Sequence, residues 1–247
     1  MIDPEWNEAV KQSARLGAFD VAVGYGSVWF TCVDGNYLAR CDLGENTCEQ
    51  IDVGNAPAGV AVGENSVWVA NSDDGTISRI DIEINEVVED IYIGCSGLFD
   101  VLVTEGAVWV TTFTGNCVYR IDPQTNQVEG EAIRVGASPV RLTFGDNSVW
   151  VSNSDDNAIS EINIETNQVV QTIQVGNNPF GIAFGKSAVW VANRMDGTVS
   201  VIDSRTKALI YTIDIPGDPI DIAFGEGSIW VLWVDENYRA KVSRIDS

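Results

Sequence analysis

Three aspartates and one arginine hold the same place in a pattern that occurs six times along the chain. The place lies just before an apolar stretch such as Val21-Ala22-Val23. Across the six copies it is held by Asp20, Gly59, Asp100, Arg141, Gly181 and Asp221. If the copies surround an axis, the charged members meet at one mouth of a central channel. We therefore interpret Asp20, Asp100, Arg141 and Asp221 as candidate ligand-binding residues.

The three aspartates are also a candidate metal site. Oxygen donors without nitrogen or sulfur ligands suit Ca²⁺ or Mg²⁺, so Asp20, Asp100 and Asp221 could hold either ion at the channel mouth. The alternative is a solvated channel lining in which an aspartate pairs with Arg141. We find no nucleophile and no general base in this set and assign no catalytic residue.

Trp233 is a further ligand-binding candidate. It stands three residues after a tryptophan that every copy repeats, and the residues at this position are Cys32, Asn71, Thr112, Asn153, Asn193 and Trp233. Asparagine here is typical of a cap on the following hairpin turn, and Trp233 departs from that chemistry. Either it is a platform for a ligand, or it packs under the longer connection over residues 234–240.

The sequence contains no histidine, which excludes several kinds of site. Ser-His-Asp and Cys-His arrangements cannot form, and zinc sites built on histidine cannot form either. The most common general base and transition-metal ligand is therefore missing. This absence favours a protein that is not an enzyme.

The net charge of −22 limits the class of partner. A strongly acidic surface repels nucleic acid and anionic membranes, so we expect neither as a partner. No apolar run is long enough to span a membrane. The first residues have no basic start followed by an apolar stretch, so we expect no signal peptide here. The acidity itself fits a solubility role, a cationic partner or a salty environment.

The five cysteines leave the redox state open. Cys41 and Cys48 face each other across a predicted hairpin, either as an apolar pair or as a disulfide. Cys95 and Cys117 could approach each other on one face of the third copy. A disulfide would support an oxidising compartment, and we weakly favour an exported or extracytoplasmic domain.

A repeated tryptophan reveals the architecture. Six of the eight tryptophans occur in a segment such as Ser66-Val67-Trp68-Val69, at intervals of 39 to 41 residues. The copy over residues 181–215 reads as four short strands, with an Asp-Gly hairpin at Asp196-Gly197. Repeats of about 40 residues with four strands each predict blades of a β-propeller. The tryptophans are best explained as packing between blades.

The two ends of the chain suggest how the ring closes. Residues 2–17 match residues 121–136, which end the third copy, whereas the sixth copy stops after its third strand. We therefore predict one all-β domain, a six-bladed propeller of four antiparallel strands per blade, in which residues 1–17 complete the last blade. The predicted blades span 18–54, 55–94, 95–136, 137–176, 177–217 and 218–247.

Segments such as Gly181-Ile182-Ala183-Phe184-Gly185 and Val189-Trp190-Val191-Ala192-Asn193 resemble YVTN-type and virginiamycin B lyase-like (streptogramin lyase-like) propellers. The resemblance covers essentially the whole chain. It implies a propeller with a binding face. The lyases of that family depend on a catalytic histidine and a magnesium ion and usually have seven blades, so the lyase activity does not carry over to this sequence.

Three functions are consistent with these observations. The first is a non-catalytic binding or scaffold propeller, part of a larger protein, which holds a protein or small ligand on an acidic loop face. The second is an ion-dependent lyase or hydrolase that uses the carboxylates at the channel mouth. The third is an excised or engineered repeat protein without a ligand of its own. We favour the first and expect a monomer.

Overall fold

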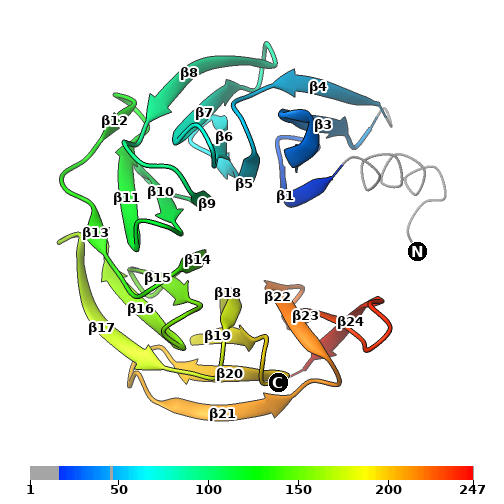
Figure 1. Cartoon of the computed structure of the whole chain (residues 1–247), viewed down its shortest axis with the longest axis vertical. Helices are drawn as coiled ribbons and strands as arrows, with labels where there is room; N and C mark the ends of the chain where they lie inside the picture. The colour runs from blue at the N-terminus through cyan, green and yellow to red at the C-terminus, as the bar shows by residue number, and fades with distance from the viewer. Residues whose placement is uncertain (1–16, 45–46, 247) are drawn as a thin grey trace. The chain divides into compact units, whose positions relative to one another are not determined.

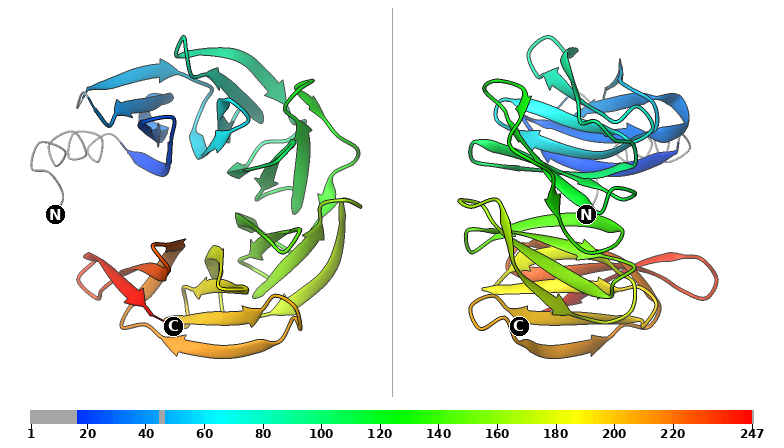
Figure 2. Two further views of the ribbon diagram at one scale, coloured as in Figure 1. Left: turned by 180° about the vertical axis from the view of Figure 1, so that it is seen from behind. Right: turned by 60° about the vertical axis from the view of Figure 1, so that its left-hand side comes forward.

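The computed structural model describes residues 17–44 and 47–246 (Figure 1). The chain forms six consecutive antiparallel sheets (Figures 1 and 2), so the predicted six-bladed β-propeller class is confirmed. Among the described residues there is no α-helix, and one short 3₁₀ turn spans Val33–Gly35. The described residues also contain no helix that is long and apolar enough to cross a membrane.

Each blade runs from an inner first strand to an outer last strand. Blade one contains β1 (Ala18–Gly24), β2 (Ser27–Cys32), β3 (Tyr37–Asp42) and β4 (Cys48–Asp52). Blade two contains β5 (Pro57–Gly63), β6 (Ser66–Asn71), β7 (Thr76–Asp81) and β8 (Glu86–Tyr92). Blade three contains β9 (Leu98–Thr104), β10 (Ala107–Thr112), β11 (Cys117–Asp122) and a split outer strand, β12 (Gln127–Val128) and β13 (Ile133–Arg134).

The second half of the chain repeats this order. Blade four contains β14 (Pro139–Gly145), β15 (Ser148–Asn153), β16 (Ala158–Asn163) and β17 (Gln168–Gln174). Blade five contains β18 (Pro179–Gly185), β19 (Ala188–Asn193), β20 (Thr198–Asp203) and β21 (Leu209–Asp214). Blade six contains β22 (Asp218–Gly225), β23 (Ser228–Val234) and β24 (Ala240–Ile245). The predicted completion of blade six by residues 1–17 falls almost wholly outside the described residues.

The chain divides into two compact units. The described part of unit 1 covers residues 17–44, 47–115 and 119–131, and that of unit 2 covers residues 116–118 and 132–246. The boundary passes through blade three, where β12 pairs with the end of β11 and β13 pairs with its start.

The repeated tryptophans pack between neighbouring blades, as predicted; Trp68, for example, shares a hydrophobic cluster with Val108 and Val110 of blade three. In every blade but the third, the indole N–H donates to the carbonyl oxygen of the glycine that ends the inner strand, as in Trp68 with Gly63 at 3.1 Å. In blade three, Trp109 donates to Thr104 Oγ1 at 3.0 Å. The four tryptophans of the first four blades are fully buried. This polar contact explains why a residue with an N–H occupies an otherwise aliphatic core.

A cation covers most of these indole rings and links neighbouring blades. In unit 1, the guanidinium of Arg79 lies 4.9 Å from the ring centroid of Trp68, and its Nη1 donates to Pro123 O and Asn126 Oδ1 of the next blade, both at 2.7 Å. In blade four, which belongs to unit 2, the charges are reversed. Glu161 replaces the arginine, and Lys207 of the following blade binds it at 2.5 Å while lying over Trp150.

Blade one differs from the others in its outer hairpin. The outer strands of blades two, four and five each contain a bulge, for example where Val88 is the extra residue between the Arg79–Glu89 and Ile80–Val87 pairs. The β3–β4 pairing has no bulge, which accounts for the shortest interval between repeated tryptophans. Cys41 and Cys48 are therefore directly opposite each other, and they form a disulfide. Of the two predicted alternatives for this pair, the disulfide is the one observed.

Candidate functional site

The predicted channel-mouth residues all lie at or beside β-bulges in the inner strands. In blade one, Phe19 and Asp20 together oppose Thr31 alone; in blade three, Phe99 and Asp100 oppose Thr111. A register shift occurs at the start of the inner strand in the other four blades too, including blades two and five, where the position is Gly59 and Gly181. A bulge re-aims the side chains next to it, so these positions are suited to present functional groups.

Hydroxyl groups hold the bulges in place. Thr31 Oγ1 accepts a hydrogen bond from the amide of Asp20 at 3.0 Å and donates to Ala58 O of the next blade at 2.6 Å. In unit 2, Ser152 Oγ accepts from the Arg141 amide at 3.1 Å and donates to Phe180 O at 2.6 Å. One hydroxyl thus fixes the bulge and joins it to the neighbouring inner strand.

Asp20 and Asp100 both lie in unit 1, and they differ in their exposure to solvent. Asp20 is partly exposed, and its Oδ2 accepts a hydrogen bond from the amide of Val60 at 3.1 Å. Asp100 is buried, with 5% of its surface exposed. Between them, Gly59 leaves no room for a side chain, because a Cβ there would lie 2.7 Å from Asp100 Cα. The glycine in this position therefore reflects crowding of the inner strands.

The other predicted residues lie in unit 2. Asp221 Oδ1 accepts from the amide of Ile222 at 2.9 Å, and a Cβ on Gly181 would lie 2.6 Å from Asp221 Cα. No group of three or more cysteine, aspartate or glutamate side chains is arranged to hold a metal ion within residues 17–44 and 47–246. The gathering of Asp20, Asp100, Arg141 and Asp221 at one channel mouth needs both units, and it stays a prediction.

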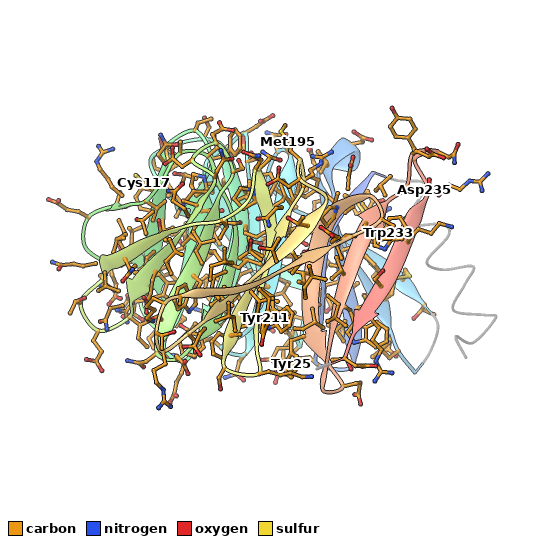
Figure 3. All side chains as sticks on the ribbon, turned by 90° about the horizontal axis from the view of Figure 1, so that it is seen from below. Tyr25, Cys117, Met195, Tyr211, Trp233 and Asp235 are labelled. Carbon is orange, nitrogen blue, oxygen red and sulfur yellow. A yellow bond between two sulfur atoms is a disulfide. The ribbon has the colours of Figure 1, made fainter. Side chains whose placement is uncertain are left out.

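Trp233, whose side chain is labelled in Figure 3, takes over the hydrogen bond of the asparagines that it replaces. Asn193 Nδ2 donates to Ser200 Oγ at 2.9 Å, and Trp233 Nε1 donates to Ser243 Oγ at 2.9 Å. The buried asparagines therefore tie the second strand to the third, which is more than the turn cap that we expected. Trp233 also covers Gly217, where a Cβ would lie 2.6 Å from its ring. Trp233 therefore packs against Gly217 and bonds Ser243. Its predicted roles, as a ligand platform or as packing under residues 234–240, stay predictions.

A cluster of phenylalanines in unit 1 was not anticipated. The rings of Phe19 and Phe99 meet edge to face, with centroids 5.4 Å apart, and Phe99 lies 6.2 Å from Phe113. Phe19 and Phe113 remain 44% and 38% exposed. Ala58 holds the matching position in the blade between them and is small enough to let the rings meet. The available sequence signal was the phenylalanine directly before two of the three aspartates.

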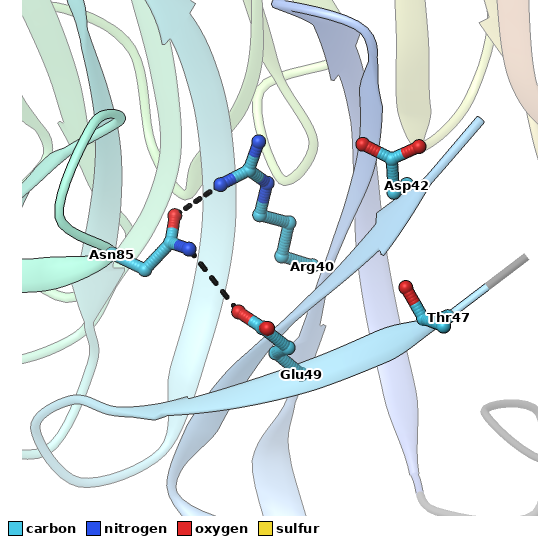
Figure 4. A pocket seen from close by; sticks show the side chains of 5 residues that line it. All are labelled: Arg40, Asp42, Thr47, Glu49 and Asn85. Carbon is cyan, nitrogen blue, oxygen red and sulfur yellow. Dashed lines mark hydrogen bonds between the residues drawn. The ribbon is translucent and has the colours of Figure 1, made fainter. Parts of the chain in front are cut away.

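A polar pocket lies at the outer hairpin of blade one (Figure 4). Its volume is about 160 Å³, and it is lined by Arg40, Asp42, Thr47, Glu49 and Asn85. Arg40 Nη1 donates to Asn85 Oδ1, and Asn85 Nδ2 donates to Glu49 Oε2 at 3.1 Å. The guanidinium also lies over Trp29. The same arginine therefore links blades one and two, and we assign the pocket no ligand.

The remaining predicted cysteine contact does not form a disulfide. Cys95 is a thiol whose sulfur lies 3.9 Å from the Tyr119 hydroxyl in unit 1. Cys117 begins β11. Cys32 is fully buried, and burial raises the pKa of its thiol.

The blades and their bulged inner strands define the chain as a six-bladed β-propeller. Among solved structures, it resembles a catalytically inactive histidine-to-alanine variant of virginiamycin B lyase from Staphylococcus aureus with quinupristin. The TM-score is 0.78 at 19% identity, covering 92% of this chain and 83% of that one. A streptogramin B lyase structure has a TM-score of 0.68 at 17% identity, covering 93% of this chain and 94% of that one.

A designed protein shares the same fold. The computationally designed Ika8 protein has a TM-score of 0.73 at 18% identity, covering 92% of this chain and 70% of that one. At these identities the likeness shows the fold alone. The predicted resemblance to virginiamycin B lyase-like propellers is therefore confirmed for the fold. No family model and no curated protein sequence matches the chain.

Proposed function

We propose that this chain is a non-catalytic binding propeller, and that its ligand site is the phenylalanine cluster of Phe19, Phe99 and Phe113 in unit 1. The proposal rests on one observation. The rings of Phe19 and Phe113 remain exposed although each of them lies beside the ring of Phe99. Burial of such rings stabilises a complex more than burial of most other side chains. Exposed apolar side chains that cluster, rather than occur singly, are characteristic of binding surfaces.

The backbone under the cluster supports this proposal. The amide of Asp20 is held by Thr31 at 3.0 Å, and the amide of Asp100 is held by Thr111 at 2.9 Å. A binding site whose backbone is already fixed loses less conformational entropy when a ligand binds. We therefore propose that the Thr31 and Thr111 hydroxyls support ligand binding as well as folding, because they hold the backbone of the site in place before a ligand binds.

The lyase activity named for two similar structures is not part of the proposal. One of those structures is a catalytically inactive variant in which a histidine is replaced, and this chain has no histidine. We further propose an exported or extracytoplasmic protein, because the Cys41–Cys48 disulfide fits an oxidising compartment. The net charge of −22 supports a partner that is neither nucleic acid nor an anionic membrane.

A fragment screen by ligand-observed NMR tests the site. The wild-type protein is compared with a Phe19→Ser/Phe113→Ser variant and with Phe144→Ser, a control whose ring is 41% exposed in unit 2. We expect fragments that bind the wild type and the control but not the double variant. Fragment binding that is unchanged in the double variant, or no binding to the wild type, contradicts the proposed site.

A further inference from the structure

We infer that the phenylalanine cluster recognises a small molecule through an aromatic ring of that molecule, rather than through an aliphatic group or a sugar. This inference rests on the proposed function, and it names the class of ligand for the same site. Three features of unit 1 support it: the angles between the rings, the area that they leave exposed, and the way in which the backbone fixes their spacing.

The rings of the cluster lie in different planes. The planes of Phe19 and Phe99 are inclined at 80°, and those of Phe99 and Phe113 at 32°. A sugar ring stacks best on a broad flat platform, which rings at these angles do not form. An aromatic ring suits them, because aromatic rings pair favourably both edge to face and in offset stacks, with centroids about 4.5–7 Å apart.

The edge-to-face contact between Phe19 and Phe99 shows which surfaces a ligand would meet. In such a pair, the positive edge of one ring lies against the negative face of the other. A ring of the ligand can form the same kind of pair with an exposed ring, whereas a saturated group has no such quadrupole and gains only from the burial of apolar area. Phe19 and Phe113 are available for this pairing, because 44% and 38% of their surfaces are exposed.

The exposed area fits a small molecule better than a protein. A fully covered aromatic side chain buries about 150–250 Å², so the exposed parts of Phe19 and Phe113 together offer roughly 120–200 Å². A stable protein–protein interface takes about 800 Å² from each partner. We therefore assign the aromatic ring to a small molecule and not to a side chain of a protein partner.

The loop that contains Phe113 is tied to two blades. The Phe113 amide donates to Gly97 O at 2.8 Å, and the Gly97 amide donates to Ser72 O of blade two at 2.7 Å. Together with the hydroxyl contacts under Phe19 and Phe99, these bonds fix the spacing of the rings before a ligand binds. Little conformational entropy is then lost on binding, so a preference for one ring type appears directly in the affinity.

Ligand-observed NMR titration of the full chain with two alcohols of similar size tests the inference. Benzyl alcohol has an aromatic ring, and cyclohexylmethanol has a saturated one. We expect benzyl alcohol to bind about two- to tenfold more tightly, the gain expected for one aromatic pair beyond the burial of area. Burial of apolar area alone predicts the reverse order, because the saturated ring has the larger apolar surface. Methyl glucoside, the sugar probe, should bind more weakly than benzyl alcohol.

Two variants test which rings set this preference. Phe113→Leu keeps an apolar side chain but removes the ring, so the ratio of the two affinities should move toward one, while the affinity for cyclohexylmethanol should change by less than about twofold. Phe19→Leu should act in the same way. Phe144→Leu is the matched control; it replaces a ring that is 41% exposed in unit 2, and the ratio should stay as in the wild type.

The outcomes separate this inference from the proposed function. If cyclohexylmethanol binds as tightly as benzyl alcohol or more tightly, and both are lost in Phe19→Ser/Phe113→Ser, the aromatic inference fails while the proposed site stands. If neither alcohol binds the wild type, the inference and the proposed site both fail. An affinity ratio that is unchanged in Phe113→Leu and Phe19→Leu would overturn the inference, as would tighter binding of methyl glucoside. Much tighter binding of a phenylalanine-containing peptide than of benzyl alcohol would overturn the assignment to a small molecule.

Discussion

The crowding of the inner strands predicts a large effect for one small substitution, Gly59→Ala. An added Cβ would lie 2.7 Å from Asp100 Cα and 2.8 Å from both Phe99 O and Val101 N. Ordinary van der Waals contacts of a Cβ begin near 3.4 Å, so the strands must separate by roughly 0.6 to 0.7 Å, the difference between these distances. All three contacted atoms belong to the backbone, which cannot rotate away as a side chain can.

Overpacking of this kind costs about 1–3 kcal/mol. In a chain of this length, each kcal/mol lowers the melting temperature by about 2–4 °C. We therefore expect Gly59→Ala to lower the unfolding free energy by about 2 kcal/mol and the melting temperature by roughly 4–8 °C. Urea unfolding and differential scanning calorimetry measure the two quantities.

Gly225→Ala is the matched control. Among the described residues no atom lies within 4 Å of a Cβ at Gly225, so the alanine should be neutral or should stabilise by up to about 1 kcal/mol through the unfolded chain. A loss below about 0.5 kcal/mol in Gly59→Ala would refute the reasoning. Rescue of Gly59→Ala by Asp100→Gly would refute it too, because the contacted atoms are backbone.

Three further predictions concern the cysteines and the loop carboxylates. Replacing Cys41 and Cys48 by alanine should lower the unfolding free energy by about 2.4 kcal/mol, the chain-entropy value for a sequence separation of 7, and a loss near zero in urea unfolding would argue against it. Backbone and side-chain hydrogen bonds from Asn55 hold the pKa of Asp74 below its usual value. This stabilisation is present above the unfolded pKa and is lost as the pH falls through the folded pKa, so Asp74→Asn should flatten the fall in urea midpoint between pH 5 and pH 2; an equally steep fall would contradict it. Cys32 should resist iodoacetamide at pH 8 until the protein unfolds, and mass spectrometry that finds rapid native alkylation would exclude the buried placement.

Much of the fold could be read from local features of the sequence. Three features predicted it: the segments like the one around Trp68, the Asp-Gly hairpin, and the interval of about 40 residues. Each depends on contacts within one blade or between adjacent blades. These features are local or repeated, so one chain supplies several independent copies of each.

The candidate site could be predicted only in part from the sequence. Sequence alignment of the copies found Asp20 and Asp100 but did not reveal that a bulge presents them, because a bulge depends on how two strands pair. The contact between Phe19 and Phe99 joins side chains that lie 80 residues apart (99 − 19) and depends on the small Ala58 in the blade between them. The role of Trp233 was ambiguous for a similar reason: its partner Ser243 lies on another strand.

The reversed ion pair between Glu161 and Lys207 means that the blades are not interchangeable modules. In unit 1, a blade presents an arginine and its successor presents an asparagine and a carbonyl oxygen. Blade four presents a carboxylate instead, so only a successor with a cation in that turn completes the contact. A copy of blade two inserted after blade four would leave Glu161 without its lysine and facing Asn85. Shuffling of the blades would break this ion pair unless a blade with a cation in that turn still followed blade four.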